Sequence, residues 1–174
     1  MLLNNSILQL RALEPEDLDM LYIWENTPPL WIHGNSLSPY SRMALRQYIN
    51  ETQQTDIYES KQLRLIIELM EDKSAVGVID LYDFDIRNSR AGVGILIDSN
   101  YRNRGYAAQV LTIIEEYAFN FLALHQLYAH ILASNEISLH LFQKAGYKET
   151  GVLTNWVQTK KGIFENVHIV QLNK

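Results

Sequence analysis

The chain has 174 residues, a length that suits one domain with its own hydrophobic core. Its formal net charge of −5 gives no electrostatic support to nucleic-acid binding. It has no cysteine, and this excludes a disulfide framework, a thiolate metal site and a cysteine nucleophile. No apolar run approaches the length of a membrane span, and residues 1–10 do not resemble a signal peptide. We therefore expect a cytoplasmic protein that does not bind a membrane. We also expect a single domain, 1–174, that does not bind nucleic acid.

The first half of the chain is predicted to form strands that enclose two helices. Proline and acidic residues at 14–17 belong in a first helical turn, and the prolines of 27–29 end that helix. Ser38 is a suitable N-cap for the second helix. The predicted helices are residues 14–26 and 40–51, with a loop at 31–39 between them. The predicted strands are residues 7–11, 62–69, 75–82 and 90–98, with a loop at 83–89 before the last of them.

The second half begins with a basic, glycine-containing turn at residues 101–108, followed by a long helix to about residue 123. The apolar residues of this helix recur at the three-and-four spacing of one buried face. A later helix stops at Gly146, a residue type that favours the position just after a helix. The remaining predicted elements are a strand at 126–132, that later helix at 135–145, and a hairpin of 149–157 and 163–172 that turns at 159–162.

This order of elements predicts an α/β sandwich with a mixed, mostly antiparallel sheet of seven strands and with four helices. The crossover through the long helix makes the strands at 90–98 and 126–132 parallel neighbours. The order does not fit a doubly wound dinucleotide-binding fold, and the turn lacks the three-glycine fingerprint that such a fold uses.

The turn at 101–108 has the features of an anion site. Unpaired backbone N–H groups point outward at a helix N-terminus, where the helix dipole favours negative charge. Gly105 lets the backbone approach a ligand closely, while Arg102 and Arg104 add positive charge with a geometry suited to phosphate. We therefore expect a phosphate-bearing ligand at this turn.

Two signatures then give the chain a resemblance to a known family. The first is Arg102-x-x-Gly105-x-Ala107 between a strand and a helix. The second comprises Asn135, Ser138, Leu141, Lys144, Gly146 and Tyr147. Together they resemble the GNAT family of N-acetyltransferases. Residues 10–18 and 151–153 look most like the branch that holds spermidine and ribosomal-protein N-acetyltransferases.

The resemblance implies acetyl-CoA as co-substrate and a splayed pair of parallel strands that forms the cleft. It places the pyrophosphate on Arg102, Asn103, Arg104, Gly105, Tyr106, Ala107 and Ala108. It places the pantetheine arm beside Ile95, Leu96 and Ile97, with Asn135 bonded to it directly or through water. It places Ser138, Leu141 and Lys144 beside the thiol end. Asn135 also fits an ordinary helix N-cap, Leu141 a packing role and Lys144 a solvated side chain.

The catalytic side chains that the resemblance implies are missing. Phe142 stands where spermidine-type members carry a tyrosine acid, and Gly92 stands where many members carry a glutamate base. A nearby tyrosine or water can substitute, and the candidate tyrosines are Tyr82, Tyr106 and Tyr147, with His140 as a further candidate base. Alternatively, positioning alone suffices, or the protein binds acyl-CoA without efficient transfer. The general acid and base are therefore left open.

The acceptor site is expected on the acidic strand end and on the loop after the first helix. Asp80, Asp83 and Asp85 are interpreted as alternating along an extended segment, so that they share a face that attracts a cationic amine, although a solvated strand end explains any one of them somewhat better. Trp31 and His33 follow the proline pair and are expected to face the substrate, whereas Trp24 is expected in the core.

These observations predict an acetyl-CoA-dependent N-acetyltransferase. The acceptor is a primary amine of a polyamine-like small molecule or a protein N-terminus, and it attacks directly in a ternary complex because no cysteine is present. A strand N–H near Leu96 is expected to bind the oxyanion. The alternative is a non-catalytic acyl-CoA-binding sensor. The histidines show no metal-ligand spacing, so no metal is expected, and the exposed edges of the final hairpin suit a homodimer.

Overall fold

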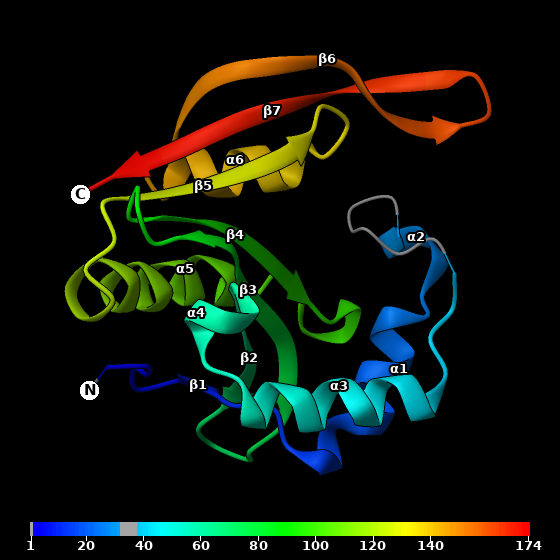
Figure 1. The fold of residues 1–174 in the computed structure, drawn as a ribbon, viewed down its shortest axis with the longest axis vertical. Coiled ribbons are helices and arrows are strands. Elements are labelled where there is room, and N and C mark those ends of the chain that lie inside the picture. The colour runs from blue at the N-terminus through cyan, green and yellow to red at the C-terminus, as the bar shows by residue number, and fades with distance from the viewer. Residues whose placement is uncertain (1, 32–37) are drawn as a thin grey trace.

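The computed structural model describes residues 2–31 and 38–174, which form one seven-stranded sheet (Figure 1). Its strand order is β1-β2-β3-β4-β5-β7-β6, and β4 and β5 form the parallel pair among otherwise antiparallel neighbours. The strands are β1 (Leu8–Arg11), β2 (Gln62–Leu69), β3 (Ala75–Asp85), β4 (Arg90–Ile97), β5 (Gln126–Leu132), β6 (Lys148–Lys160) and β7 (Ile163–Asn173). The predicted mixed α/β sheet and its parallel neighbours are confirmed.

The described residues contain more helices than the four that were predicted. The helices are α1 (Leu18–Glu25), α2 (Pro28–Trp31), α3 (Arg42–Gln54), α4 (Ile57–Ser60), α5 (Tyr106–Glu116) and α6 (Glu136–Lys144). Two of them are single turns. The proline pair expected to end a helix also begins α2, because proline fits a first helical turn. Asp56 caps α4 by accepting hydrogen bonds from the N–H groups of Tyr58 and Glu59.

Several predicted boundaries are wrong for local reasons. The side chain of Ser41, not Ser38, caps α3 by accepting from the N–H of Ala44 at 3.1 Å, so the helix begins two residues later than predicted. The long helix leaves the α-helical pattern at Glu116 and continues as a π-helical turn over Tyr117–Phe121. Strand β3 extends to Asp85, into the segment predicted as a loop.

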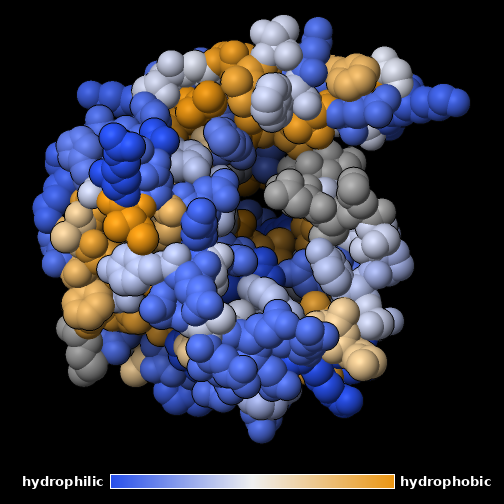
Figure 2. Space-filling model, viewed as in Figure 1, coloured by the Kyte–Doolittle hydropathy of each residue, from blue (hydrophilic) through white to orange (hydrophobic). Residues whose placement is uncertain are grey.

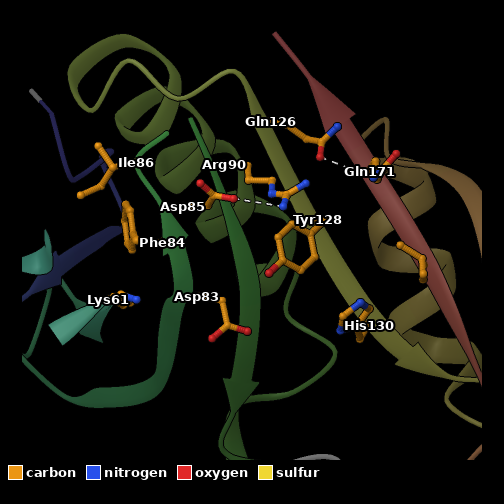
Figure 3. Close-up of a pocket in the computed structure, with 11 residues that line it drawn as sticks. Lys61, Asp83, Phe84, Asp85, Ile86, Arg90, Gln126, Tyr128, His130 and Gln171 are labelled. Carbon is orange, nitrogen blue, oxygen red and sulfur yellow. Dashed lines mark hydrogen bonds and ion pairs between the residues drawn. The ribbon is translucent and has the colours of Figure 1, made fainter. Parts of the chain in front are cut away.

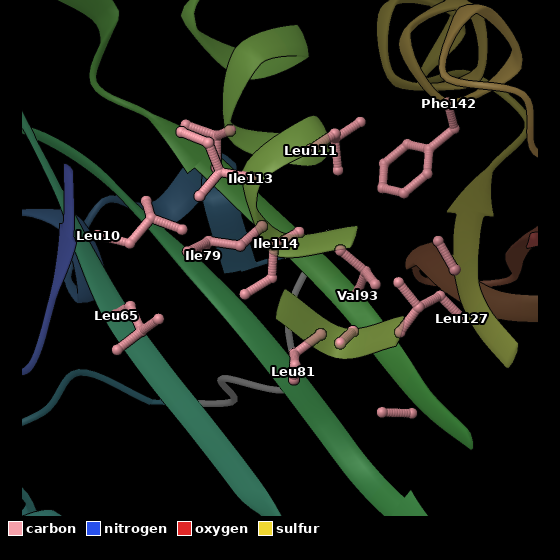
Figure 4. Close-up of a cluster of buried hydrophobic side chains, with 14 of the residues drawn as sticks. Leu10, Leu65, Ile79, Leu81, Val93, Leu111, Ile113, Ile114, Leu127 and Phe142 are labelled. Atoms are coloured by element: carbon pink, nitrogen blue, oxygen red, sulfur yellow. The ribbon is translucent and has the colours of Figure 1, made fainter. Parts of the chain in front are cut away.

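The sheet separates two hydrophobic clusters. One lies between the sheet and helices α5 and α6, and Figure 4 shows Leu10, Ile79, Leu111 and Phe142 among its members. The other lies under α1 and α3, where Trp24 is 7% exposed and joins the core as expected. The Trp24 indole N–H donates to Asp98 at 2.7 Å. Alternate residues of β2–β4 thus face either α5 or α1 and α3, and the second of these sides is the α1–α3 face.

A charged cluster is built into the α1–α3 face. Arg64 of β2 donates through Nε and Nη2 to the two carboxylate oxygens of Asp80 at 2.7 and 2.9 Å. Its Nη1 donates to Glu25 of α1 at 2.5 Å. These contacts tie α1 to the middle of the sheet, and they use Asp80 in a structural ion pair.

The closing hairpin of β6 and β7 projects beyond the body of the sheet (Figure 1). Strand β6 is an edge strand, and Trp156, Ile163 and Phe164 are exposed on the hairpin. These features agree with the expected homodimer, which stays a prediction. Within the described part of the chain, no helix has the length and apolar character that a membrane span requires.

Glu115 of α5 makes the stability of the fold depend on pH. Burial raises the pKa of this carboxyl to about 7, and the neighbouring Tyr147 hydroxyl offsets part of that rise. The folded state therefore holds the proton more tightly than the unfolded chain. The resulting stabilisation is fully present below the unfolded pKa of about 4.3 and is lost as the pH rises through about 7.

We expect Glu115→Gln, which keeps the neutral shape, to raise the free energy of unfolding at pH 8 by about 1 kcal/mol, a value reduced for the partial exposure of the group. The advantage over the unmodified protein should shrink at pH 5. Chemical denaturation at both pH values measures it, with the exposed neighbour variant Glu116→Gln as control. The same pH dependence in Glu115→Gln and in the unmodified protein would contradict the assignment.

Candidate active site

The parallel strands β4 and β5 separate along their length. In the described structure they pair at Arg90↔Gln126, Ala91↔Leu127 and Gly92↔Tyr128, whereas β4 continues to Ile97 and β5 to Leu132. The expected splay is therefore present, with its apex at Gly92 and Tyr128. Beyond the apex, the edge of β4 that faces β5 presents backbone groups to which an extended ligand can add like another strand.

The glycine turn follows directly after this free edge. Asn103 and Gly105 have positive φ values of 60° and 75°, which turn the chain sharply into α5. No side chain caps the start of α5, and among the described residues no heavy atom lies within 4 Å of the position of a Cβ at Gly105. The first-turn N–H groups of α5 thus lack a side-chain acceptor, and the space before them is open to an anion.

The two arginines of the turn are exposed and held by their own backbone. Arg102 Nε donates to the carbonyl of Ile97 at 3.0 Å, and Arg104 Nη2 donates to the carbonyl of Asn100 at 3.1 Å. Arg104 also lies 5.2 Å from the ring centre of Tyr101. These contacts use one nitrogen of each guanidinium and orient both cations beside the start of α5.

Helix α6 lies on the same side of the sheet as α5 and carries the second signature. Asn135 accepts a hydrogen bond from the N–H of Ser138 at 3.2 Å, so its side chain is a helix N-cap. Leu141 is half-buried and Lys144 is exposed. Phe142 is 2% exposed and packs edge-to-face on Tyr147 at 4.9 Å, which places the ring in the core.

A groove opens on the α1–α3 face, beside the apex of the splay. It has a volume of about 710 Å³, and Figure 3 shows Asp83, Tyr128 and His130 along it. Leu127 and Ala129, which alternate with Tyr128 and His130, are buried on the opposite face. Figure 2 shows this side of the molecule hollowed between the hairpin strands and helices α1 and α3. A ligand in the groove and one along β4 would therefore meet at the opening between the strands.

The three acidic residues do not form one uniform patch. Asp80 is paired with Arg64, and Asp85 is paired with Arg90 at 3.0 Å. Asp83 is exposed and lines the groove. Its φ of 50° falls within a register shift between β3 and β4, so the regular strand alternation that we assumed is interrupted there.

Of the two residues expected in the acceptor loop, Trp31 is described by the structure and His33 is not. Trp31 is half-buried at the end of α2, and its indole N–H donates to the carbonyl of Glu25 at 2.7 Å. His33 lies outside the described residues. Among residues 2–31 and 38–174, no group of three His, Asp or Glu side chains is arranged to hold a metal ion.

Some site residues were missed by the sequence interpretation. Tyr128 and His130 line the groove because they lie two apart on β5, next to the splay. Their alternation with apolar residues in 126–132 is the signal that could have identified them. Arg64 could have been noticed as a cation inside an otherwise apolar strand, but its partners on α1 and β3 are not visible in the sequence.

Comparisons with known proteins agree with this geometry. The family profile described as "Acetyltransferase (GNAT) domain" matches residues 8–148. The spermidine N(1)-acetyltransferase of Vibrio cholerae is 26% identical over 149 residues, 86% of this chain and 83% of that protein. The spermidine N(1)-acetyltransferase of Escherichia coli K12 is 25% identical over 145 residues, 83% of this chain and 75% of that protein.

The fold is also similar to a solved structure. The spermidine N-acetyltransferase from Vibrio cholerae, crystallised in complex with CoA and spermine, superposes with a TM-score of 0.85 at 25% identity. The alignment covers 97% of this chain and 96% of that one.

Proposed function

The chain belongs to the acetyltransferase (GNAT) family of N-acetyltransferases, and we propose that it transfers the acetyl group of acetyl-CoA to a primary amine of a polyamine-like small molecule. One observation carries this proposal. The uncapped start of α5 and the groove lined by Asp83 lie at two approaches to the same opening between β4 and β5. Such an arrangement brings a thioester and an amine together without a covalent enzyme intermediate.

The residues present fit a CoA pyrophosphate and pantetheine arm. The first-turn N–H groups of α5, together with Arg102 and Arg104, would hold the pyrophosphate. The free edge of β4 would pair with the amides of the arm, and a backbone N–H of this edge would stabilise the oxyanion of the transition state. The α6 signature residues Ser138 and Lys144 would flank the arm.

The groove would bind the acceptor as a cation. An alkylammonium with a pKa of about 10 is neutral in roughly one molecule per thousand at pH 7, so the site must both attract the cation and let one amine lose its proton. Asp83 lies in the groove at its exposed side, where it would bind a distal ammonium and leave the reacting nitrogen at the apex. A polyamine, which carries several amines along one chain, matches this division of roles.

We expect Asp83→Asn to raise KM for spermidine about three- to fivefold with little change in kcat, because an exposed ion pair contributes up to about 1 kcal/mol. Added salt should reduce the difference, since it screens exposed charges. Steady-state thiol release measures the effect. The matched control is Asp72→Asn, which makes the same charge change on the turn between β2 and β3. Equal KM values in the two variants would remove Asp83 from the acceptor site.

The competing function is a sensor that binds acyl-CoA without efficient transfer. It is supported by Phe142 and Gly92, which supply neither an acid nor a base. Thiol release across a panel of polyamines, amino-terminal peptides and aminoglycosides separates the alternatives. Acceleration by polyamines supports the proposal, acceleration by peptides alone changes the acceptor class, and release at the background rate with every amine supports the sensor.

A further inference from the structure

Tyr82 occupies the space that a side chain at position 92 would fill. It lies on β3 directly opposite Gly92 of β4. A Cβ added to Gly92 would come within 2.3 Å of Cε2 and 2.4 Å of Cζ of the Tyr82 ring. Gly92 is also the last β4 residue that pairs with β5 in the described structure. The hydroxyl end of Tyr82, which belongs to β3, therefore lies at the apex of the splay between β4 and β5.

The phenol lies beside β5. The backbone of His130, two residues past the apex, is close enough to lower the pKa of the phenol, which offsets part of the rise caused by burial. The ring of Tyr128 packs edge-to-face at 6.1 Å. The phenol carries its own O–H proton, which it can donate to a ligand at the apex. Tyr82 thus spans three strands at the point where two of them part.

We propose that Tyr82 is a catalytic residue that shuttles the proton during acetyl transfer. This inference rests on the proposed function. A pantetheine arm that ran from the glycine turn back along the free edge of β4 would approach Gly92, over which the Tyr82 ring lies. An amine in the groove reaches the same point past Asp83 and Tyr128.

The step balances without an external reagent. The neutral amine nitrogen forms a bond to the acetyl carbon as the carbon–sulfur bond breaks. The departing sulfur takes the phenol proton, and the phenolate oxygen of Tyr82 takes a proton from the nitrogen. The products are the amide and the thiol, and Tyr82 is restored. Burial raises the pKa of Tyr82 to about 12, with Tyr128, Asp83 and Asp80 adding to the rise, so the phenol starts with its proton in place.

The other candidate tyrosines are less well placed. Tyr106 lies in the first turn of α5, at the pyrophosphate end of the site. Tyr147 is buried beside Glu115 and Phe142 in the cluster under α5 and α6, on the opposite face of the sheet from the groove. Tyr82 contacts the apex at Gly92 and packs against Tyr128, which lines the groove.

The test is Tyr82→Phe, which removes the hydroxyl and keeps the ring over Gly92. We expect kcat to fall by about 100-fold, a typical contribution of general acid–base catalysis, with acetyl-CoA affinity and melting temperature unchanged. The control Tyr117→Phe removes a hydroxyl from a half-buried ring that stacks on Phe121, away from the cleft, and should keep the unmodified kcat. A Tyr82→Phe variant that keeps more than half of the unmodified kcat overturns the inference.

A second readout separates chemistry from structure. A ring-fluorinated tyrosine at position 82 has a more acidic phenol, so the alkaline decline of kcat should move to lower pH; an unmoved pH profile overturns the inference. The two proposals fail differently. If the unmodified protein does not transfer acetyl to any amine, the proposed function fails. If it does and Tyr82→Phe matches it, the role of Tyr82 alone is wrong.

Discussion

Replacing Gly105 by Asp is expected to weaken acetyl-CoA binding by about 30- to 1000-fold, because a carboxylate a few ångströms from the pyrophosphate adds about 2–4 kcal/mol of repulsion at an effective dielectric constant near 20. The new side chain would also fill the open space in front of α5. Isothermal titration calorimetry with acetyl-CoA measures the change in Kd.

The chain supplies a matched control for this substitution. Gly162, at the tip of the β6–β7 hairpin, has a φ of 77°, close to the 75° of Gly105, and a Cβ there also meets no described heavy atom within 4 Å. Gly162→Asp therefore carries the same charge and the same backbone strain without approaching the anion site. Comparable Kd values for the two variants would show that the pyrophosphate does not bind at this turn.

Replacing Arg64 by Met is expected to lower the free energy of unfolding by about 3 kcal/mol, because it leaves Asp80 and Glu25 as uncompensated charges in a largely buried cluster. The side chains of Arg64, Asp80 and Glu25 are 17%, 16% and 22% exposed, so solvent screens their interaction only weakly. Chemical denaturation measures the loss. Adding Asp80→Asn to the Arg64→Met variant should recover part of it, since the new amide carries no charge.

An exposed ion pair provides the comparison for Arg64. Arg42 pairs with Asp19 on the outer surface, where the two side chains are 51% and 79% exposed. Arg42→Met should cost about 1 kcal/mol or less, because exposed ion pairs contribute little. If Arg64→Met is as mild as Arg42→Met, then the cluster does not hold α1 against the sheet.

The sheet could be predicted because its information is local. Hydrophobic periodicity identified every strand and the long helix, and the crossover rule made β4 and β5 parallel neighbours. The errors fell at the boundaries of elements and at the single-turn helices. Asp56 and Ser41 each had to be recognised as a cap among several polar neighbours, and α2 and α4 are single turns that propensity does not resolve.

In the candidate site, too, the part built from contiguous residues could be predicted and the part built from distant segments could not. The turn around Gly105 is contiguous, so its residues and its open helix N-terminus could be predicted together. The acceptor side depends on contacts between distant segments. Asp80 was expected to face the substrate, but its pairing with Arg64 follows from the register of β2 with β3. The position of Tyr82 above Gly92 likewise follows from the register of β3 with β4, which the sequence does not specify.

The most direct measurement is mass spectrometry of spermidine incubated with the protein and acetyl-CoA, with released thiol counted in the same reaction. The proposed function predicts a spermidine product heavier by one acetyl group, formed in proportion to protein and matched by one thiol per acetyl group transferred. Thiol release at the same rate with and without amines, together with no acetylated product, would contradict it.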